Sequence, residues 1–159
     1  MQVVRRQPVT IVKGLGTKVW DDENKEYLDF TSGWAVNNLG HCHPAIVEAI
    51  KNQAETLMQT SNQFFTVPQV QLAQLLVENS CLDRVFFANS GAEANEAAIK
   101  LARKHGHIKR NIDNPIILCA KDSFHGRTMA TVAAAGNKSH MQNFVPGDQG
   151  FDQVEWGDT

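Results

Sequence analysis

The sequence has few cysteines and no long apolar run, and each absence excludes a class of protein. Its three cysteines lie far apart without C-x-x-C spacing, at Cys42, Cys81 and Cys119. They predict neither a disulfide framework nor a zinc site, and buried free thiols in a reducing compartment fit them better. No apolar run approaches the roughly 20 residues of a membrane helix, and the N-terminus lacks the apolar stretch of a signal peptide. We therefore expect a cytoplasmic protein with no membrane partner, although an organelle enzyme that has lost its transit peptide would share these features.

An excess of charge of one sign is also missing, as are the common nucleotide-binding loops. The 159 residues carry 15 Lys and Arg against 17 Asp and Glu, a net charge of -2, with no basic stripe. A nucleic acid partner is therefore not expected. Neither G-x-x-x-x-G-K-[ST] nor G-x-G-x-x-G occurs, which excludes nucleotide-binding loops of those two kinds. What remains is a globular chain, 42% hydrophobic and long enough to bury one core.

The first half of the chain predicts a hairpin followed by two helices. Residues 10–30 contain two extended stretches around a polar cluster at 21–24, which is typical of a β-hairpin. Pro44 opens a helix whose apolar residues recur at helical spacing, at Ile46, Ala49, Ile50, Ala54 and Leu57. Thr66 and Gln69 form the capping-box pattern of a second helix.

The second half predicts a βαβ unit. Residues 84–88 predict a buried strand, residues 92 to about 104 a helix with one apolar face, and residues 115–120 a second strand. This order implies an α/β fold with a parallel sheet and a right-handed crossover. A third helix is expected from about 128 to 135, and no usable period follows residue 136. Because the chain stops without an ending signal, we expect it to be cut from a longer protein.

The turn Ser90-Gly91-Ala92-Glu93 is the first candidate site, since it joins a predicted strand to the start of a helix. Ligands of open α/β sheets bind at such a turn, and the free N–H groups of a helix start attract phosphate. Glycine at 91 and alanine at 92 let a ligand approach the backbone closely. The alternative is an ordinary capping box formed by Ser90 and Glu93, with nothing bound.

The second candidate cluster, residues 122–127, follows the next predicted strand, so we expect both turns to face one cleft. Phe124 could stack on a planar heteroaromatic ring, and Arg127 could pair with a substrate carboxylate through two hydrogen bonds. The alternatives are that Phe124 closes the hydrophobic core and that Arg127 is a solvated surface charge.

Taken together, these stretches resemble the class III aminotransferases. The resemblance is carried by Asn89 to Arg103 and by Phe124-His125-Gly126-Arg127-Thr128. Upstream, the similar stretches are Trp20-Asp21, Tyr27-Leu28-Asp29-Phe30, Gly33-Trp34-Ala35-Val36-Asn37 and Gly40-His41-Cys42-His43-Pro44. The similarity is nearly continuous from about Gly14 to Arg127 and is strongest to the acetylornithine and ornithine branch.

The resemblance implies an incomplete fold-type I transferase that uses pyridoxal 5'-phosphate. Residues 1–40 would then be the hairpin and entrance segment of a small domain. Residues 41–159 would be the first part of the cofactor-binding large domain, with its mostly parallel sheet. The implied reaction moves an amino group between N-acetylornithine and 2-oxoglutarate in arginine biosynthesis, and the implied assembly is a homodimer.

The resemblance also implies roles for individual residues. Gly91 and Ala92 match positions whose backbone N–H groups hold the cofactor phosphate, with Ser90 beside them. Phe124 matches the aromatic ring that stacks on the pyridine, and Arg127 the arginine that pairs with the substrate α-carboxylate. Trp34 falls where the ornithine branch has an aromatic residue at the substrate entrance.

The chain contains no catalytic residue that the resemblance would identify. Transamination needs a Schiff-base lysine and a carboxylate beside the pyridine nitrogen, and in the family both lie further along the chain. None of the lysines here has the family's Schiff-base context: Lys13, Lys18, Lys25, Lys51, Lys100, Lys104, Lys109, Lys121 and Lys138. We therefore expect this chain to be inactive alone.

Several alternatives remain open. The amino donor could be ornithine, succinylornithine or 4-aminobutyrate, or the chain could be a stand-alone, non-catalytic module that binds cofactor or a partner. A metal site at His41, Cys42 and His43 is rejected, since ligands this close together cannot close a tetrahedral site. For His125 a structural role is favoured over proton transfer.

Overall fold

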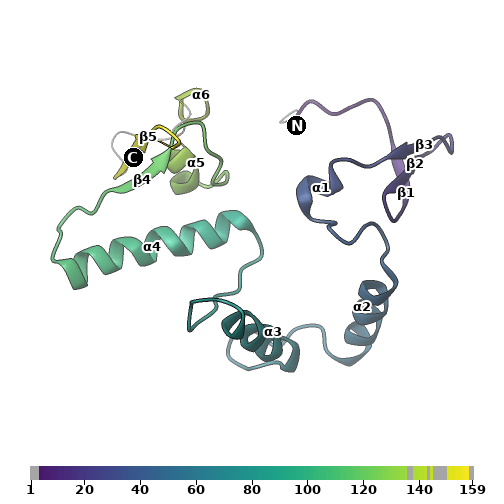
Figure 1. Ribbon diagram of the computed structural model, residues 1–159, viewed down its shortest axis with the longest axis horizontal. Helices are drawn as coiled ribbons and strands as arrows, with labels where there is room; N and C mark the ends of the chain where they lie inside the picture. Colours follow the sequence, from purple (N-terminus) through teal and green to yellow (C-terminus); the bar gives the residue numbers. More distant parts are fainter. Residues whose placement is uncertain (1–3, 136–137, 143, 145–149, 158–159) are drawn as a thin grey trace. The chain divides into compact units, whose positions relative to one another are not determined.

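The computed structural model describes residues 4–135, 138–142, 144 and 150–157. The chain divides into two compact units, residues 1–69 and 70–159, which are described separately (Figure 1). The predicted boundary after residue 40 separates two domains of a full-length enzyme. It is a different kind of boundary from this division and stays a prediction. None of the described helices is long and apolar enough to cross a membrane.

The first unit contains a three-stranded antiparallel sheet in the order β1-β2-β3 (Figure 1). Its strands are β1 (Ile11–Leu15), β2 (Lys18–Asp21) and β3 (Glu26–Leu28). The predicted hairpin around residues 21–24 is confirmed, because β2 pairs with β3. The buried Asp21 carboxylate holds its turn by accepting hydrogen bonds from Lys25 N at 2.8 Å and the Tyr27 hydroxyl at 2.7 Å.

The prediction of one continuous strand before that turn was wrong. The chain folds back at Gly16, where φ is +56°, so that β1 and β2 form a further hairpin. A positive φ costs glycine little, which is why the reversal occurs there. The sequence pattern missed it because Gly16 and Thr17 interrupt the apolar alternation too briefly to mark a turn.

The next helices along the chain are α1 (Ser32–Ala35), α2 (Pro44–Thr56) and α3 (Val67–Glu78), and most of α3 belongs to the second unit. Both helices predicted for this part of the chain are confirmed. Pro44 stands in the first turn of α2 after an extended His43, as expected for a residue that lacks a backbone N–H. Neither α2 nor α3 contains a buried residue, so their apolar faces are exposed.

The second unit combines α4 (Gly91–Arg110), β4 (Ile117–Ala120), α5 (Met129–Ala135), α6 (Lys138–Met141) and β5 (Phe151–Val154). The strands β4 and β5 pair in parallel. A small core joins Ile99 of α4, Cys119 of β4 and Ala134 of α5. Both α4 and α5 thus pack against this two-stranded sheet, and the predicted mixture of helices with a parallel sheet is confirmed.

One strand of the predicted βαβ unit was misplaced. Residues 84–88 form no strand and have no pairing partner in the described part of the chain, and Phe86 is 71% exposed. The parallel partner of β4 is instead β5, in the stretch where no period was found. A strand exists through pairing with another strand, and local sequence does not reveal that partner.

Candidate functional site

The start of α4 is a complete helix cap. Ser90 is the N-cap residue, and its hydroxyl accepts a hydrogen bond from Glu93 N at 3.2 Å. The Glu93 carboxylate accepts in return from Asn89 N at 2.7 Å, and bonds from the Asn89 side chain and backbone lower its pKa. The capping box weighed as an alternative is therefore present, although it does not use all the backbone donors.

Two backbone donors remain at the tip of this helix. The N–H groups of Gly91 and Ala92 have no intrahelical acceptor, and no partner for them occurs in the described part of the chain. A Cβ built on Gly91 would meet nothing within 4 Å, so the space in front of that backbone is open. The positive end of a 20-residue helix faces that space. A phosphate group fits these donors, and the cap leaves them available.

The loop 122–128 is fixed against the first turns of α4. Asn95 Nδ2 donates a hydrogen bond to His125 O at 2.7 Å, and the Thr128 hydroxyl donates to the Glu96 carboxylate. The buried Gly126 lies against Ala92, because a Cβ at Gly126 would come within 2.8 Å of the Ala92 Cβ. The structure thus brings the two predicted turns together at the carboxyl end of β4.

Phe124 and Arg127 project from this loop toward solvent. The Phe124 side chain is 69% exposed, so it does not close the core as the alternative proposed. The Arg127 guanidinium carbon lies 5.9 Å from the Phe124 ring centre, and no ion pair involving Arg127 occurs among the described residues. An aromatic face and a free guanidinium are therefore neighbours beside the helix start.

His125 serves the loop's own structure. Its Nδ1 lies 3.3 Å from the Ser123 hydroxyl, which donates to Ala120 O at 2.6 Å. These contacts agree with the structural role predicted for His125. Sequence reasoning missed Asn95 and Gly126, and the spacing of Asn95 from the helix start was the signal that could have identified it.

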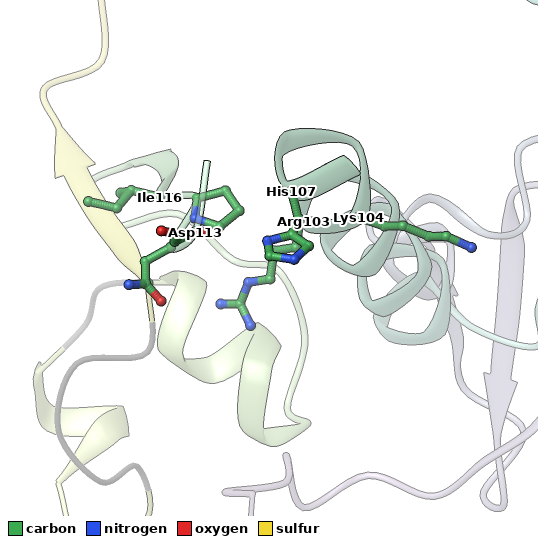
Figure 2. Close-up of a pocket in the computed structure, with 8 residues that line it drawn as sticks. Arg103, Lys104, His107, Asp113 and Ile116 are labelled. Atoms are coloured by element: carbon green, nitrogen blue, oxygen red, sulfur yellow. The ribbon is translucent and has the colours of Figure 1, made fainter. Parts of the chain in front are cut away.

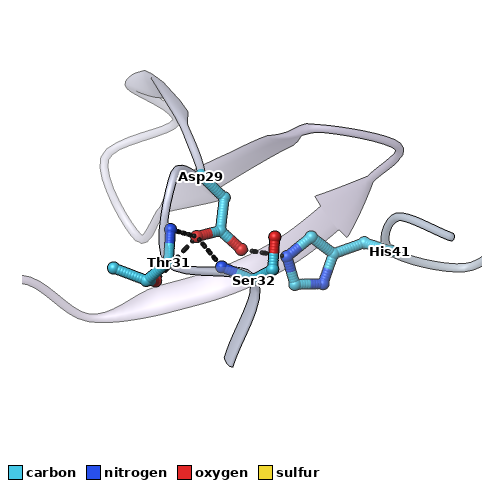
Figure 3. Close-up of polar contacts among 4 residues, drawn as sticks. All are labelled: Asp29, Thr31, Ser32 and His41. Carbon is cyan, nitrogen blue, oxygen red and sulfur yellow. Dashed lines mark hydrogen bonds and ion pairs between the residues drawn. The ribbon is translucent and has the colours of Figure 1, made fainter. Parts of the chain in front are cut away.

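The remaining predicted site residue, Trp34, belongs to the first unit. It is 96% exposed in α1. Nearby, His41 Nε2 lies 2.7 Å from an oxygen of Asp29 (Figure 3). Among the described residues, no group of three His, Cys, Asp or Glu could hold a metal ion.

A separate cleft of about 740 Å³ lies at the other end of β4 (Figure 2). It is lined by Arg103, Lys104, His107, Asp113, Asn114, Pro115, Ile116 and Gly150. Arg103 also covers the Phe151 ring at 4.9 Å. Ligands of parallel sheets bind at the carboxyl ends of the strands, so this cleft is not the first candidate.

Comparison with known proteins assigns the chain to a family. The family model described as aminotransferase class-III matches residues 1–158. The acetylornithine aminotransferase of Thermosynechococcus vestitus is 52% identical over 158 residues, which are 99% of this chain and 38% of that protein. This chain therefore spans about two fifths of the length of the relatives it matches.

Solved structures of the family have a similar backbone fold. An ornithine aminotransferase from Toxoplasma gondii, with partial occupancy of PLP at its active site, matches with a TM-score of 0.93 and 33% identity over 99% of this chain and 37% of its own. N-acetylornithine aminotransferase from Stenotrophomonas maltophilia K279a matches with a TM-score of 0.78 and 35% identity, over 96% of this chain and 36% of its own. The fold is thus part of a fold-type I transferase, and pyridoxal phosphate is the cofactor of the family. Since both the sequence match and the backbone match run through nearly all of it, the chain belongs to the class III aminotransferases.

Proposed function

We propose that this chain is the cofactor-holding part of a transaminase that moves an amino group between N-acetylornithine and 2-oxoglutarate. One observation carries the proposal: the free N–H groups of Gly91 and Ala92 open on solvent beside a loop that presents Phe124 and Arg127. The arrangement offers a phosphate anchor, an aromatic face and a carboxylate partner at one end of α4. These are the three contacts that pyridoxal phosphate and an amino acid require.

Each contact has a physical basis in this chain. The Gly91 and Ala92 donors would hold the cofactor phosphate, with the helix dipole favouring its negative charge. Phe124 would lie against the pyridine ring, and Arg127 would bind the substrate α-carboxylate through two N–H donors. When bound, pyridoxal phosphate supplies the electron sink for transamination. The lysine and the carboxylate that this chemistry also needs would come from the rest of the full-length protein.

The choice of N-acetylornithine rests on sequence similarity. The curated relatives that match at about 50% identity are named acetylornithine aminotransferase. Under this proposal the full-length protein takes part in arginine biosynthesis as a cytoplasmic homodimer. Ornithine is the second candidate donor, because the Toxoplasma gondii ornithine aminotransferase gives a TM-score of 0.93. The kcat/KM values of the full-length protein for the two donors decide between them.

Substitution of Arg127 tests the proposed carboxylate contact. In the full-length protein, Arg127→Ala should raise the KM for every amino donor by roughly 10- to 100-fold, the range that a charge-assisted hydrogen bond supports. The absorbance of the bound cofactor should stay near that of the unsubstituted protein, because Arg127 is not assigned to the phosphate or the ring.

Arg84→Ala is the matched control. Arg84 is also exposed, and no side-chain hydrogen bond or ion pair of Arg84 occurs among the described contacts. Arg84→Ala also removes one positive charge, but at a position outside the candidate site, and it should leave the KM for the amino donors unchanged. If Arg127→Ala behaves like this control, the carboxylate assignment is wrong.

A further inference from the structure

The segment that carries Trp34 has an unusual backbone. Four successive residues have positive φ: Ser32 at 47°, Gly33 at 62°, Trp34 at 61° and Ala35 at 62°. L-residues avoid this left-handed region because their Cβ approaches the following carbonyl, and only one of the four is glycine. Such a conformation persists only when its surroundings fix it, and it often occurs at functional sites. The contacts that fix this turn therefore identify what it depends on.

One carboxylate holds the entrance to the left-handed turn. The Asp29 Oδ1 atom accepts hydrogen bonds from Thr31 N at 2.9 Å, the Thr31 hydroxyl at 2.8 Å and Ser32 N at 2.9 Å (Figure 3). The turn closes when Ser32 O accepts from Val36 N at 2.9 Å. Asp29 thus binds the two residues that precede Gly33 and Trp34.

The second oxygen of Asp29 ties the turn to the sheet through His41. Its Oδ2 lies 2.7 Å from His41 Nε2. The His41 backbone exchanges two hydrogen bonds with Gly16, at 2.8 and 2.9 Å. The imidazole lies directly over Gly14, where a Cβ would come within 2.6 Å of the ring. His41 is therefore held by β1 and the turn after it, and it in turn holds Asp29.

Asp29 is partly buried and ionised, as a side chain that holds a backbone turn through hydrogen bonds should be. Its side chain is only 12% exposed, although the tryptophan it supports is 96% exposed. The hydrogen bonds from His41, Thr31 and Ser32 hold the pKa of Asp29 far below its usual range, so it is ionised at neutral pH. Trp34 has no packing role in the described unit, and holding it outward costs backbone strain.

We propose that Asp29 and His41 are positioning residues that hold the left-handed turn and so present Trp34 to the amino donor. The inference rests on the proposed function and on the substrate contact that the family resemblance implies for Trp34. It adds a structural cause for the direction in which the chain presents Trp34, because the backbone before Trp34 is held by a carboxylate five residues away and not by the protein core. Neither Asp29 nor His41 touches the donor.

The first test compares three substitutions in the full-length protein. Asp29→Ala removes the carboxylate that accepts from Thr31 and Ser32 and should lower kcat/KM for the amino donor by up to about 100-fold, mostly through KM, since a shift near 1 Å can have that effect. Asp29→Asn keeps one acceptor oxygen and should restore most of the loss. The control Asp22→Ala removes an exposed carboxylate from the same unit and should change nothing. An unchanged KM in Asp29→Ala overturns the proposal.

A double substitution separates positioning from a merely structural role. If Asp29 acts through Trp34, Asp29→Ala should have no further effect on donor KM in a protein that already carries Trp34→Ala. Additive effects overturn the proposal. A normal donor KM for Trp34→Ala alone also overturns the proposal. In that case the substrate role of Trp34 is wrong, whereas the proposed role of Arg127 is unaffected. If Trp34→Ala raises the donor KM but Asp29→Ala does not, the positioning role of Asp29 is wrong and the substrate role of Trp34 stands.

Hydrogen exchange gives a readout that does not depend on activity. In the full-length protein, Asp29→Ala should raise amide exchange at Thr31 and Ser32 by roughly 10-fold, the effect of losing one net hydrogen bond. Should that variant fail to fold, His41→Gln removes the imidazole at Oδ2 but keeps the three hydrogen bonds to Oδ1, and it should give a smaller increase over the same residues. Unchanged exchange in both variants overturns the proposal.

Discussion

The loops that present Phe124 and Trp34 are held by different means. In the second unit, the middle of the loop 122–128 rests on packing: Gly126 is wedged between Ala92 and Thr131, and Thr131 is completely buried. Among the described residues, only the end of that loop contacts a carboxylate, through the Thr128 hydroxyl and Glu96. In the first unit, the turn of Trp34 rests on one carboxylate with four hydrogen-bond contacts. Close packing tolerates changes of charge and pH but not added volume, whereas a carboxylate clamp has the opposite sensitivities.

The largest effect should come from adding one methyl group to the packed loop. At Gly126, φ is +136°, and a Cβ would lie 2.7 Å from the Thr131 hydroxyl and 2.8 Å from the Ala92 Cβ. Gly126→Ala in the full-length protein should therefore cost about 1–3 kcal/mol of unfolding free energy, measured by urea denaturation. It should also weaken pyridoxal phosphate binding, because the loop can no longer lie against α4.

Gly91→Ala is the matched control for that experiment. The same methyl group at Gly91 meets nothing within 4 Å, so the unfolding free energy should stay close to that of the unsubstituted protein. Cofactor affinity should nevertheless fall, since the methyl group occupies the space assigned to the phosphate. Equal loss of stability in both variants would show that steric packing at Gly126 does not hold the loop.

A middle-sized effect is expected at the helix cap. Ser90→Ala removes the acceptor for Glu93 N and should cost about 1 kcal/mol, as measured by urea denaturation. Ser90→Asn, which keeps a side-chain acceptor at the N-cap, should recover most of that stability. If Ser90→Ala changes cofactor affinity with no change in stability, the hydroxyl belongs to the phosphate site more than to the cap.

The smallest effect should appear in acid, at the turn that carries Trp34. The folded pKa of Asp29 is lowered, mainly by His41, so its contribution to stability is full above the ordinary pKa of 3.8. That contribution is lost as the pH falls below 3.8 toward the folded pKa. As the pH is lowered from 4, amide exchange at Thr31 and Ser32 should therefore rise by more than at His125 and Gly126, after correction for the intrinsic rate. Parallel changes in both loops would remove the distinction between them.

Sequence reasoning was most successful where structure depends on neighbours in the chain. Helix α2 follows from apolar spacing and from Pro44 at its start, and α3 follows from the pattern of Thr66 and Gln69. The cap formed by Ser90 and Glu93 follows from residues three apart. The same reasoning identified the turn and the loop that meet at α4, because both were placed after strands of one sheet, although residues 84–88 did not form their strand.

The failures share a physical cause, which is distance along the chain. Local sequence cannot show that β4 pairs with β5, since pairing depends on two segments that meet only after folding. Likewise, the strained turn at Trp34 is fixed by contact between Asp29 and His41, which are 12 residues apart. No propensity of Ser32 or Trp34 predicts positive φ.

The sequence by itself determined the family, the positions of the main helices and the candidate residues that we propose for the phosphate, the ring and the carboxylate. These properties depend on residue type and on short spacings along the chain, which are visible in the sequence without the folded structure. Tertiary structure alone decided which strands pair, which glycine must remain glycine and how Trp34 is held outward. Those properties depend on excluded volume and hydrogen bonds between distant segments, which form only when the chain has folded.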